Sequence, residues 1–328
     1  MILNKIDIFY DELNQSITII MGIRLLSKLL KKKCGHKIQT THLSVLSGKK
    51  ICIDTSIYLY RYKSQNALIE KFYLMCSIFK KYNIIPVFIF DGKPSELKQN
   101  TINERREKRE EAWQKYEKYK NNVGENPNKK QLERLTNIKR SFIKINRNDI
   151  ENIKSLIDSY GMKYMNAESE ADVLCASLVK QKKVYAVLTE DMDLFAYGCN
   201  VILRYLSLVN HTCMIYNIKD ILKILQINLA DFQTLCIISG TDYNKSTRNI
   251  FQNLDLYKIY NKSGYNCFKY WLSDYNYIVD INKFDTILDV FNNTNNVLKN
   301  YPYILIKYGY INFSKLFSIL KKERFIFI

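Results

Sequence analysis

The sequence has few of the residues that build metal-thiolate or disulfide sites. Its eight cysteines are scattered singly, with no CxxC pair, and it has only three histidines. Neither a zinc site nor a disulfide framework has its expected spacing. We therefore expect a protein of a reducing, intracellular compartment, either the nucleus or the cytoplasm.

Long apolar runs are missing as well. No run reaches the roughly 18 residues that span a bilayer. Asp7, Asp11 and Glu12 interrupt the first twenty residues, where a signal peptide would be continuously apolar. The sequence predicts no membrane partner.

Negative charge is scarce relative to positive charge. The chain has 50 Lys and Arg residues against 32 Asp and Glu residues, which gives a formal net charge of +18. Such an excess is typical of proteins that bind a polyanion, although a solvated basic surface gives the same count. With 328 residues, 47% of them hydrophobic, the chain can form one large domain or two small ones.

Short apolar runs alternate with helical patterns along the first two thirds of the chain. The runs read as buried strands and lie at residues 51–54, 86–91, 184–189 and 201–205. The helical patterns lie at about 65–82, 149–160 and 170–182. Alternation of this kind predicts an α/β fold with a mostly parallel central sheet, flanked by helices on both faces.

Three of these runs end in acid. Asp54, Asp91 and Asp191 would emerge together at the carboxyl edge of a parallel sheet, where such folds bind ligands. Each alone could equally be a turn former or a helix cap. Three on one edge favour a site.

Two further pairs of carboxylates are each separated by two residues: Glu170 with Asp172, and Asp191 with Asp193. At a helix entry or in an extended segment, both members of such a pair can face one ligand. Convergent carboxylates repel one another unless a hard cation lies between them, and Mg²⁺ or Mn²⁺ suits oxygen ligands. The sequence predicts a divalent-metal site, with the two-ion arrangement of phosphoryl transfer as one form of it.

Residues 95–120 are almost continuously polar, yet rich in good helix formers. A helix that is polar all round projects from the body or bridges parts of it. Residues 121–128 break the pattern, and a second basic helical stretch runs from 129 to about 144. A solvated spacer and a nucleic-acid contact both fit this segment.

Six short blocks resemble, in order and spacing, the flap endonuclease (FEN/XPG) family of structure-specific 5′ nucleases. They are MGIR at 21–24, IDTS at 53–56, FDGKP at 90–94, AESEAD at 167–172, TEDMD at 189–193 and ISGTDY at 238–243. The resemblance covers about residues 21–245. It implies a PIN-like 5′-nuclease fold with a helical arch at about 95–146, and a helical C-terminal region from 246 to 328.

The resemblance also implies a ligand set for two Mg²⁺ ions, with Mn²⁺ as a substitute. The family's seven metal-site carboxylates fall on Asp54, Asp91, Glu170, Asp172, Asp191, Asp193 and Asp242. None of the seven is substituted. We place Glu168 and Glu190 outside this set, Glu190 as a capping residue or one that supports the ligands.

The family's arch-base cations, which contact the scissile phosphate, fall on Lys98 and Arg105. Tyr60 matches a residue on which the family stacks the base next to the cut, although a core or surface tyrosine is an equal alternative. The remaining candidate nucleic-acid-binding residues are Gly22, Arg106, Lys108 and Arg109.

The implied activity is that of a Mg²⁺-dependent structure-specific endonuclease or 5′–3′ exonuclease. Its DNA partners would carry 5′ flaps, nicks, ends or junctions in replication, repair or recombination. Two alternatives stay open: an RNA-directed 5′ nuclease, since related sheets also process RNA, and a non-catalytic DNA-binding platform.

The chain departs from the family at both ends. Twenty residues precede Met21, so either translation starts at Met21 or residues 1–20 form an extension. After Asp242, Asn249 and Phe251 occupy the glycine positions of the family's helix-two-turn-helix hairpin, which puts its K⁺ site and duplex contact in doubt. No sliding-clamp peptide is found in the tail. The degenerate hairpin, the missing clamp motif and an AT-rich codon bias resemble divergent viral members of the family, such as poxviral ones.

Overall fold

A seven-stranded sheet forms the centre of the molecule. The structure is a computed structural model that describes residues 22–124, 127–294, 296–301 and 306–323. The strand order is β1-β7-β6-β5-β2-β3-β4. The strands are β1 (Gln39–His42), β2 (Lys50–Asp54), β3 (Ile85–Phe90), β4 (Lys163–Asn166), β5 (Ala186–Leu188), β6 (Val201–Ser207) and β7 (Thr212–Asn217).

Five consecutive strands of this order, from β6 to β4, are parallel to one another. β2 pairs in parallel with β3 and with β5, and β4 and β6 continue the parallel arrangement on either side. β7 is antiparallel to both β6 and β1. The predicted α/β fold with a mostly parallel sheet is therefore confirmed, and the antiparallel edge is an addition to it.

Both faces of the sheet are buried. In β2, Ile51 and Ile53 pack into one hydrophobic cluster, whereas Cys52 packs into the other. Successive strand residues point to opposite faces, so a strand buried on both faces becomes continuously apolar. This explains why the run at 51–54 lacks polar alternation.

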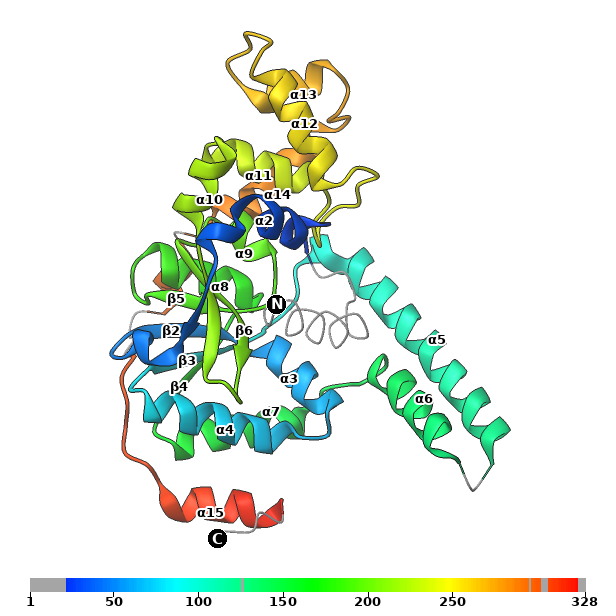
Figure 1. Ribbon diagram of the computed structural model, residues 1–328, viewed down its shortest axis with the longest axis vertical. Helices are drawn as coiled ribbons and strands as arrows, with labels where there is room; N and C mark the ends of the chain where they lie inside the picture. The colour runs from blue at the N-terminus through cyan, green and yellow to red at the C-terminus, as the bar shows by residue number, and fades with distance from the viewer. Residues whose placement is uncertain (1–21, 125–126, 295, 302–305, 324–328) are drawn as a thin grey trace.

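Helices cover both faces of the sheet (Figure 1). The α-helices up to β6 are α2 (Leu26–Cys34), α3 (Thr55–Ser64), α4 (Leu68–Lys81), α5 (Gln99–Val123), α6 (Lys129–Arg140), α7 (Arg147–Ser159), α8 (Ala171–Lys180) and α9 (Asp193–Ala196). Those after β7 are α10 (Ile218–Leu225), α11 (Leu229–Ile238), α12 (Ile250–Tyr260), α13 (Phe268–Asp274), α14 (Ile281–Asn292) and α15 (Phe313–Lys322). The 3-10 helices of the described ranges are η1 (Gly35–Lys37), η2 (Leu43–Leu46), η3 (Glu96–Lys98) and η4 (Val297–Asn300).

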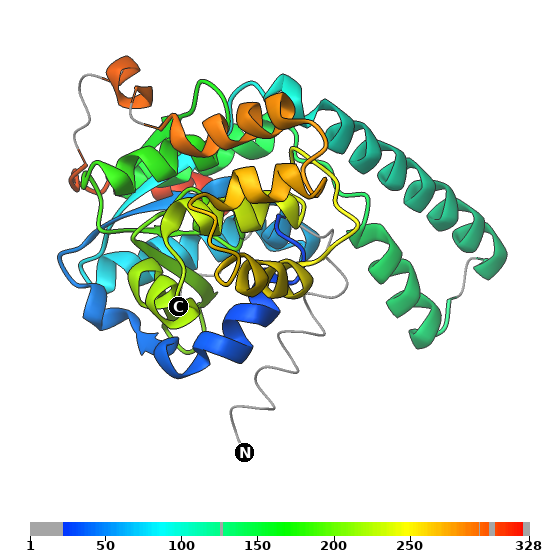
Figure 2. The ribbon, with the colours of Figure 1, turned by 90° about the horizontal axis from the view of Figure 1, so that it is seen from above.

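Helices α5 and α6 form a hairpin that projects from one side of the body (Figures 1 and 2). The Tyr116 and Phe142 rings lie 5.3 Å apart, and the Arg134 guanidinium lies 4.6 Å from the centre of the Tyr119 ring. Asn128 caps the start of α6. Every described residue of α5 is exposed or half-buried, which is what its all-round polarity predicts. We call this hairpin the arch.

The C-terminal helices pack back onto the body. In Figure 1, α12 and α13 lie at one end of the molecule and α15 at the other. Leu316 and Leu320 of α15 are buried in the cluster that also contains Ile153 and Leu156 of α7. The amphipathic C-terminal helix is thus a packed element, with Phe313 and Phe317 of the same helix at least half exposed.

All eight cysteines lie in the described part of the chain and are free thiols. Among the described residues, no single helix is long and apolar enough to cross a membrane; α10 and α11 meet that test only when joined, across an 82° bend. Residues 1–20 and Met21 lie outside the described residues, and so do the predictions about the start of the chain.

Candidate active site

Carboxylates gather at the carboxyl edge of the sheet. Asp54 is the last residue of β2, Asp91 follows β3 directly, and Asp191 comes shortly after β5. Glu170 precedes the first residue of α8, and Asp172 lies in its first turn. The parallel topology therefore brings side chains from distant parts of the sequence to one place, as the strand-end rule predicts.

Six of the seven predicted metal ligands are buried. Their exposed fractions are 4% for Asp54, 7% for Glu170, 9% for Asp172, 4% for Asp191, 1% for Asp193 and 7% for Asp242. Asp91 is exposed. Buried carboxylates are costly unless they are paired, hydrogen-bonded or bound to a cation, so this concentration needs a compensating partner.

Local hydrogen bonds orient several of these carboxylates. The Thr189 hydroxyl donates to Asp54 Oδ2 at 2.9 Å, and the backbone N–H of Asp193 donates to Asp191 Oδ1 at 2.9 Å. Asp91 Oδ1 accepts the N–H of Ala171 at 2.8 Å, at the start of α8. Asp91 therefore caps the start of α8, as the helix-cap alternative allowed, and it also lies at the acidic edge of the sheet.

Repulsion and burial keep protons on the group. Burial raises the pKa of Asp54 to about 8, with the charges of Asp91 and Asp191 adding to the effect. Burial also raises the pKa of Asp191, and raises those of Asp172 and Asp193 well above their ordinary value. Clusters with such pKa shifts are a feature of functional sites, where carboxyls stay buried beside one another although this destabilises the folded state.

The side chain of Asp193 is the clearest unfulfilled ligand. Both of its carboxylate oxygens are buried and have no hydrogen-bond partner among the described residues. Gly22 packs against the same place with φ +77°, and a Cβ atom there would lie 2.7 Å from Asp193 Oδ1 and 2.8 Å from Asp191 Oδ1. Only glycine permits this approach. The donor set fits a hard divalent cation.

Two cations from the base of the arch reach the remaining carboxylates. Lys98 Nζ forms an ion pair with Glu170 and lies 3.7 Å from Asp242 Oδ2. Arg105 Nη2 lies 2.9 Å from Asp242 Oδ2. Burial alone would lower the pKa of Lys98. The surrounding carboxylates, Asp172 first, raise this pKa by more than burial lowers it, so the lysine stays charged.

These contacts bear on the metal prediction. Within the described residues, no group of three His, Cys, Asp or Glu side chains is assembled as a ready metal site. Lys98 forms an ion pair with Glu170, and Arg105 forms one with Asp242. These two carboxylates are predicted metal ligands. The predicted ligands therefore lie together, with part of their negative charge already neutralised by the chain's own cations.

The other candidate nucleic-acid-binding residues lie outside the carboxylate cluster. Tyr60 on α3 is 42% exposed. Arg106 and Lys108 are exposed on α5, and Arg109 is half-buried. The base stacking predicted for Tyr60 and the DNA contacts predicted for Arg106, Lys108 and Arg109 stay predictions.

Glu168 and Glu190 are held by residues other than the predicted ligands. Asn300 donates to Glu168 Oε2 at 2.7 Å. The N–H of Tyr205 donates to Glu190 Oε1 at 2.8 Å, and Arg204 lies 3.7 Å from its other oxygen. Their predicted place outside the ligand set stays a prediction.

The duplex-binding hairpin also departs from the family in structure. Asn249 takes φ −103° and caps α12 through its side chain, and Phe251 is the second residue of that helix. Both positions therefore have a helix-entry backbone rather than the left-handed backbone that glycine favours. The doubt about a K⁺ site at these positions stands as a prediction.

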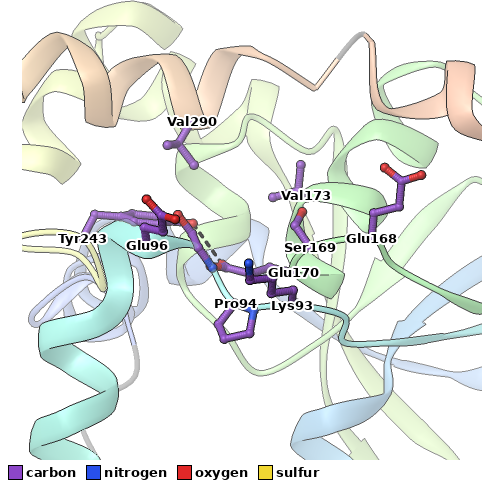
Figure 3. Close-up of a pocket in the computed structure, with 10 residues that line it drawn as sticks. Lys93, Pro94, Glu96, Glu168, Ser169, Glu170, Val173, Tyr243 and Val290 are labelled. Carbon is purple, nitrogen blue, oxygen red and sulfur yellow. Dashed lines mark hydrogen bonds between the residues drawn. The ribbon is translucent and has the colours of Figure 1, made fainter.

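Sequence reasoning did not single out Tyr243. It lines a pocket of about 370 Å³ beside Glu170, together with Lys93, Ser95 and Val290 (Figure 3). Burial and the charge of Glu170 raise the pKa of Tyr243 well above its ordinary value, so its hydroxyl stays a donor. The only sequence signal was its place beside Asp242 in the block at 238–243.

The fold and the acidic edge define an α/β protein with a site of hard, oxygen-donating ligands. The chain matches the family model of the XPG N-terminal domain over residues 21–112, and that of the XPG I-region over residues 161–242. Most of the arch lies between the two matched segments. The chain therefore belongs to the flap endonuclease (FEN/XPG) family, and the resemblance in the sequence is confirmed.

Individual relatives agree with this assignment. Flap endonuclease 1 of Aedes aegypti is 32% identical over 248 residues, which cover 70% of this chain and 63% of the relative. The human flap endonuclease 1 is 30% identical over 249 residues, with the same two shares. The chain thus covers less than two thirds of these relatives. The catalytic core of Rad2, solved in complex with DNA substrate, has a similar fold, with a TM-score of 0.61, 20% identity and coverage of 92% and 94% of the two chains.

Proposed function

We propose that the chain is a divalent-metal-dependent nuclease that hydrolyses phosphodiester bonds in flap, nicked or branched DNA. The observation that carries this proposal is the buried acidic edge, where both oxygens of Asp193 lack a partner among the described residues while arch cations lie on Glu170 and Asp242. A surface that only held phosphate would gain from losing these acids.

The residues divide the work. Two Mg²⁺ ions, when bound, would activate water and stabilise the entering and leaving oxygens of the phosphodiester. By resemblance to the family, Asp91, Glu170 and Asp172 would hold mainly one ion. Asp191, Asp193 and Asp242 would hold the other, and Asp54 completes the set.

Lys98 and Arg105 would neutralise the charge on the phosphate. Both side chains lie at the carboxylates, at the point where the arch joins the body. To reach a phosphate, the two cations would leave the carboxylate oxygens of Glu170 and Asp242 and bind the oxygens of the phosphate instead. This keeps the change in electrostatic energy small, because each cation has an anionic partner before and after the exchange.

The choice of DNA as substrate rests on the relatives and on charge. The named relatives are flap endonucleases, and the Rad2 core was solved with a DNA substrate. The net charge of +18 suits a polyanion.

The test uses a labelled 5′-flap duplex, its RNA counterpart and plain single strands, in Mg²⁺ and in Ca²⁺. Wild type should cut the flap DNA in Mg²⁺ only, and Asp54→Ala and Asp191→Ala should lose at least a hundredfold in rate, on the order of the loss from removing a metal ligand or its support. Asp255→Ala is the matched control, because its exposed carboxylate pairs with Lys258 of the same helix, α12.

Each outcome has a meaning. Cleavage that survives in Asp54→Ala and Asp191→Ala would remove these residues from the site. Preference for the RNA substrate would favour an RNA-directed nuclease. Tight, salt-sensitive DNA binding without any cleavage by wild type would favour a binding platform.

A further inference from the structure

Tyr243 connects a predicted metal ligand with an arch-base cation. Its hydroxyl donates to Glu170 Oε2 at 3.0 Å. Its ring lies under Lys98, with Nζ 4.7 Å from the ring centre. Figure 3 shows Tyr243 and Glu170 at the wall of the same pocket. One side chain therefore contacts both charged partners of the Lys98–Glu170 ion pair.

Tyr243 is itself held firmly. It is 7% exposed, its hydroxyl lies 3.1 Å from that of Tyr197, and its N–H donates to the Thr241 hydroxyl at 3.1 Å. The ring of Phe291, on α14, meets the Tyr243 ring edge-on at 5.7 Å. A side chain fixed from several directions can fix others, because it has little freedom left to lose.

The two contacts have different physical effects. Glu170 accepts the Tyr243 hydroxyl on Oε2 and the N–H of Ser95 on Oε1 at 3.3 Å, so both of its oxygens are oriented. Outer hydrogen bonds of this kind orient a metal-binding carboxylate. The ring attracts the Lys98 ammonium through a cation–π interaction, which needs no hydroxyl.

We propose that Tyr243 is a positioning residue with two separable roles: its hydroxyl orients Glu170 toward the metal, and its ring holds Lys98 at the base of the arch. The proposal rests on the proposed nuclease function. It links the metal site to the C-terminal region, because Phe291 supports the tyrosine ring from α14.

Two substitutions separate the roles. Tyr243→Phe removes the hydroxyl but keeps the ring and its packing on Phe291. Tyr243→Leu removes the hydroxyl and the aromatic ring. Mn²⁺ binding without DNA, followed by electron paramagnetic resonance, should weaken about tenfold in each variant. Cleavage of a flap substrate at saturating Mn²⁺ should return to within about threefold of wild type for Tyr243→Phe. Tyr243→Leu should stay about tenfold slower in kcat, because Lys98 is then misplaced.

Tyr308→Phe is the matched control. It also removes a hydrogen-bonded hydroxyl, a partly buried one that donates to the Ile84 carbonyl outside the site. It should change neither Mn²⁺ affinity nor kcat. Thermal unfolding of each variant shows whether it folds, and if Tyr243→Leu does not, Tyr243→Met removes the hydroxyl and the ring with a more adaptable side chain.

Unchanged Mn²⁺ affinity in Tyr243→Phe would overturn the role of the hydroxyl. Equal kcat values of Tyr243→Phe and Tyr243→Leu at saturating Mn²⁺ would overturn the role of the ring. Failure of the proposed function has a different signature: wild type would bind Mn²⁺ without cutting any substrate, while the affinity difference between wild type and Tyr243→Phe remained.

Discussion

Arg105 places one guanidinium nitrogen, Nη2, within 3.0 Å of Asp242 Oδ1 and 2.9 Å of Asp242 Oδ2. Thr101, one turn earlier on α5, donates its hydroxyl to the Asp242 carbonyl at 2.7 Å. The base of the arch is thus attached to a predicted metal ligand at two points. A metal ion that binds Asp242 must compete with Arg105 for the same carboxylate oxygens. Metal binding and the position of the arch are therefore physically coupled.

Removal of the arginine charge should strengthen metal binding in the absence of DNA. In Arg105→Met, Asp242 loses the nearer of its two cationic partners and keeps Lys98 at 3.7 Å. Mn²⁺ affinity measured by titration calorimetry should rise about tenfold, the equivalent of one charge-assisted hydrogen-bonded pair. Cleavage should fall in the same variant, because the phosphate loses its neutralising partner. Lys118→Met, an exposed position of α5, serves as the control. Equal Mn²⁺ affinity in wild type and Arg105→Met would refute the coupling.

Replacement of Asp193 by a neutral residue should stabilise the metal-free fold. The same replacement should reduce the stabilisation that bound metal gives. Both carboxylate oxygens lack a partner among the described residues, and burial raises the pKa of the group. Asp193→Asn removes a buried carboxyl that must take up a proton or hold an unpaired charge in the folded state, so the free energy of unfolding in urea with EDTA should rise by about 1 to 2 kcal/mol.

Mg²⁺ should raise the melting temperature of wild type by linkage, and that of Asp193→Asn much less. Asp255→Asn, on the surface of α12, should behave as wild type in both measurements. A metal-free Asp193→Asn variant less stable than wild type would show that the aspartate has a structural role instead.

The sequence predicts the centre of the fold better than its edges. The runs at 51–54 and 86–91 lie within one residue of β2 and β3 at both ends, because their burial on both faces makes them continuously apolar. β1, β4 and β7 were not predicted. β1 reads QTTH and none of its residues is buried, so its strand state comes from pairing with β7 rather than from propensity.

The acidic edge was predictable for a topological reason, since parallel strands deliver their ends to one place. The contacts made there were not. Lys98 and Arg105 were expected to face a phosphate, and in the structure they lie on Glu170 and Asp242. Such pairings depend on tertiary contacts that sequence spacing does not encode, and the same holds for Tyr243.

The metal-free protein should lose stability as the pH rises through the pKa of Asp54. Burial, with Asp91 and Asp191, raises this pKa from 3.8 to about 8. Below about pH 4 the carboxyl is protonated in both states. Between the two values the folded state keeps a proton that the unfolded state has lost, so this contribution to stability declines until the pH passes about 8.

The measurement is the difference in melting temperature between wild type and Asp54→Asn in EDTA, recorded from about pH 5 to about pH 9. The difference should move in favour of Asp54→Asn as the pH rises, and saturating Mg²⁺ should restore the stability of wild type at high pH. A difference that stays constant with pH would mean that Asp54 titrates at an ordinary value.

The exposed cations of the arch should act through charge alone. Arg106 and Lys108 are exposed on α5. If each contacts one backbone phosphate, Arg106→Gln or Lys108→Gln should weaken binding of flap DNA and reduce the slope of log affinity against log salt by about one. Cleavage at saturating substrate should change little. Lys321→Gln on α15, which Figure 1 places away from the arch, is the matched control. An unchanged salt slope in both arch variants would mean that this face of α5 does not touch DNA, and would favour the solvated spacer helix that its composition also allows.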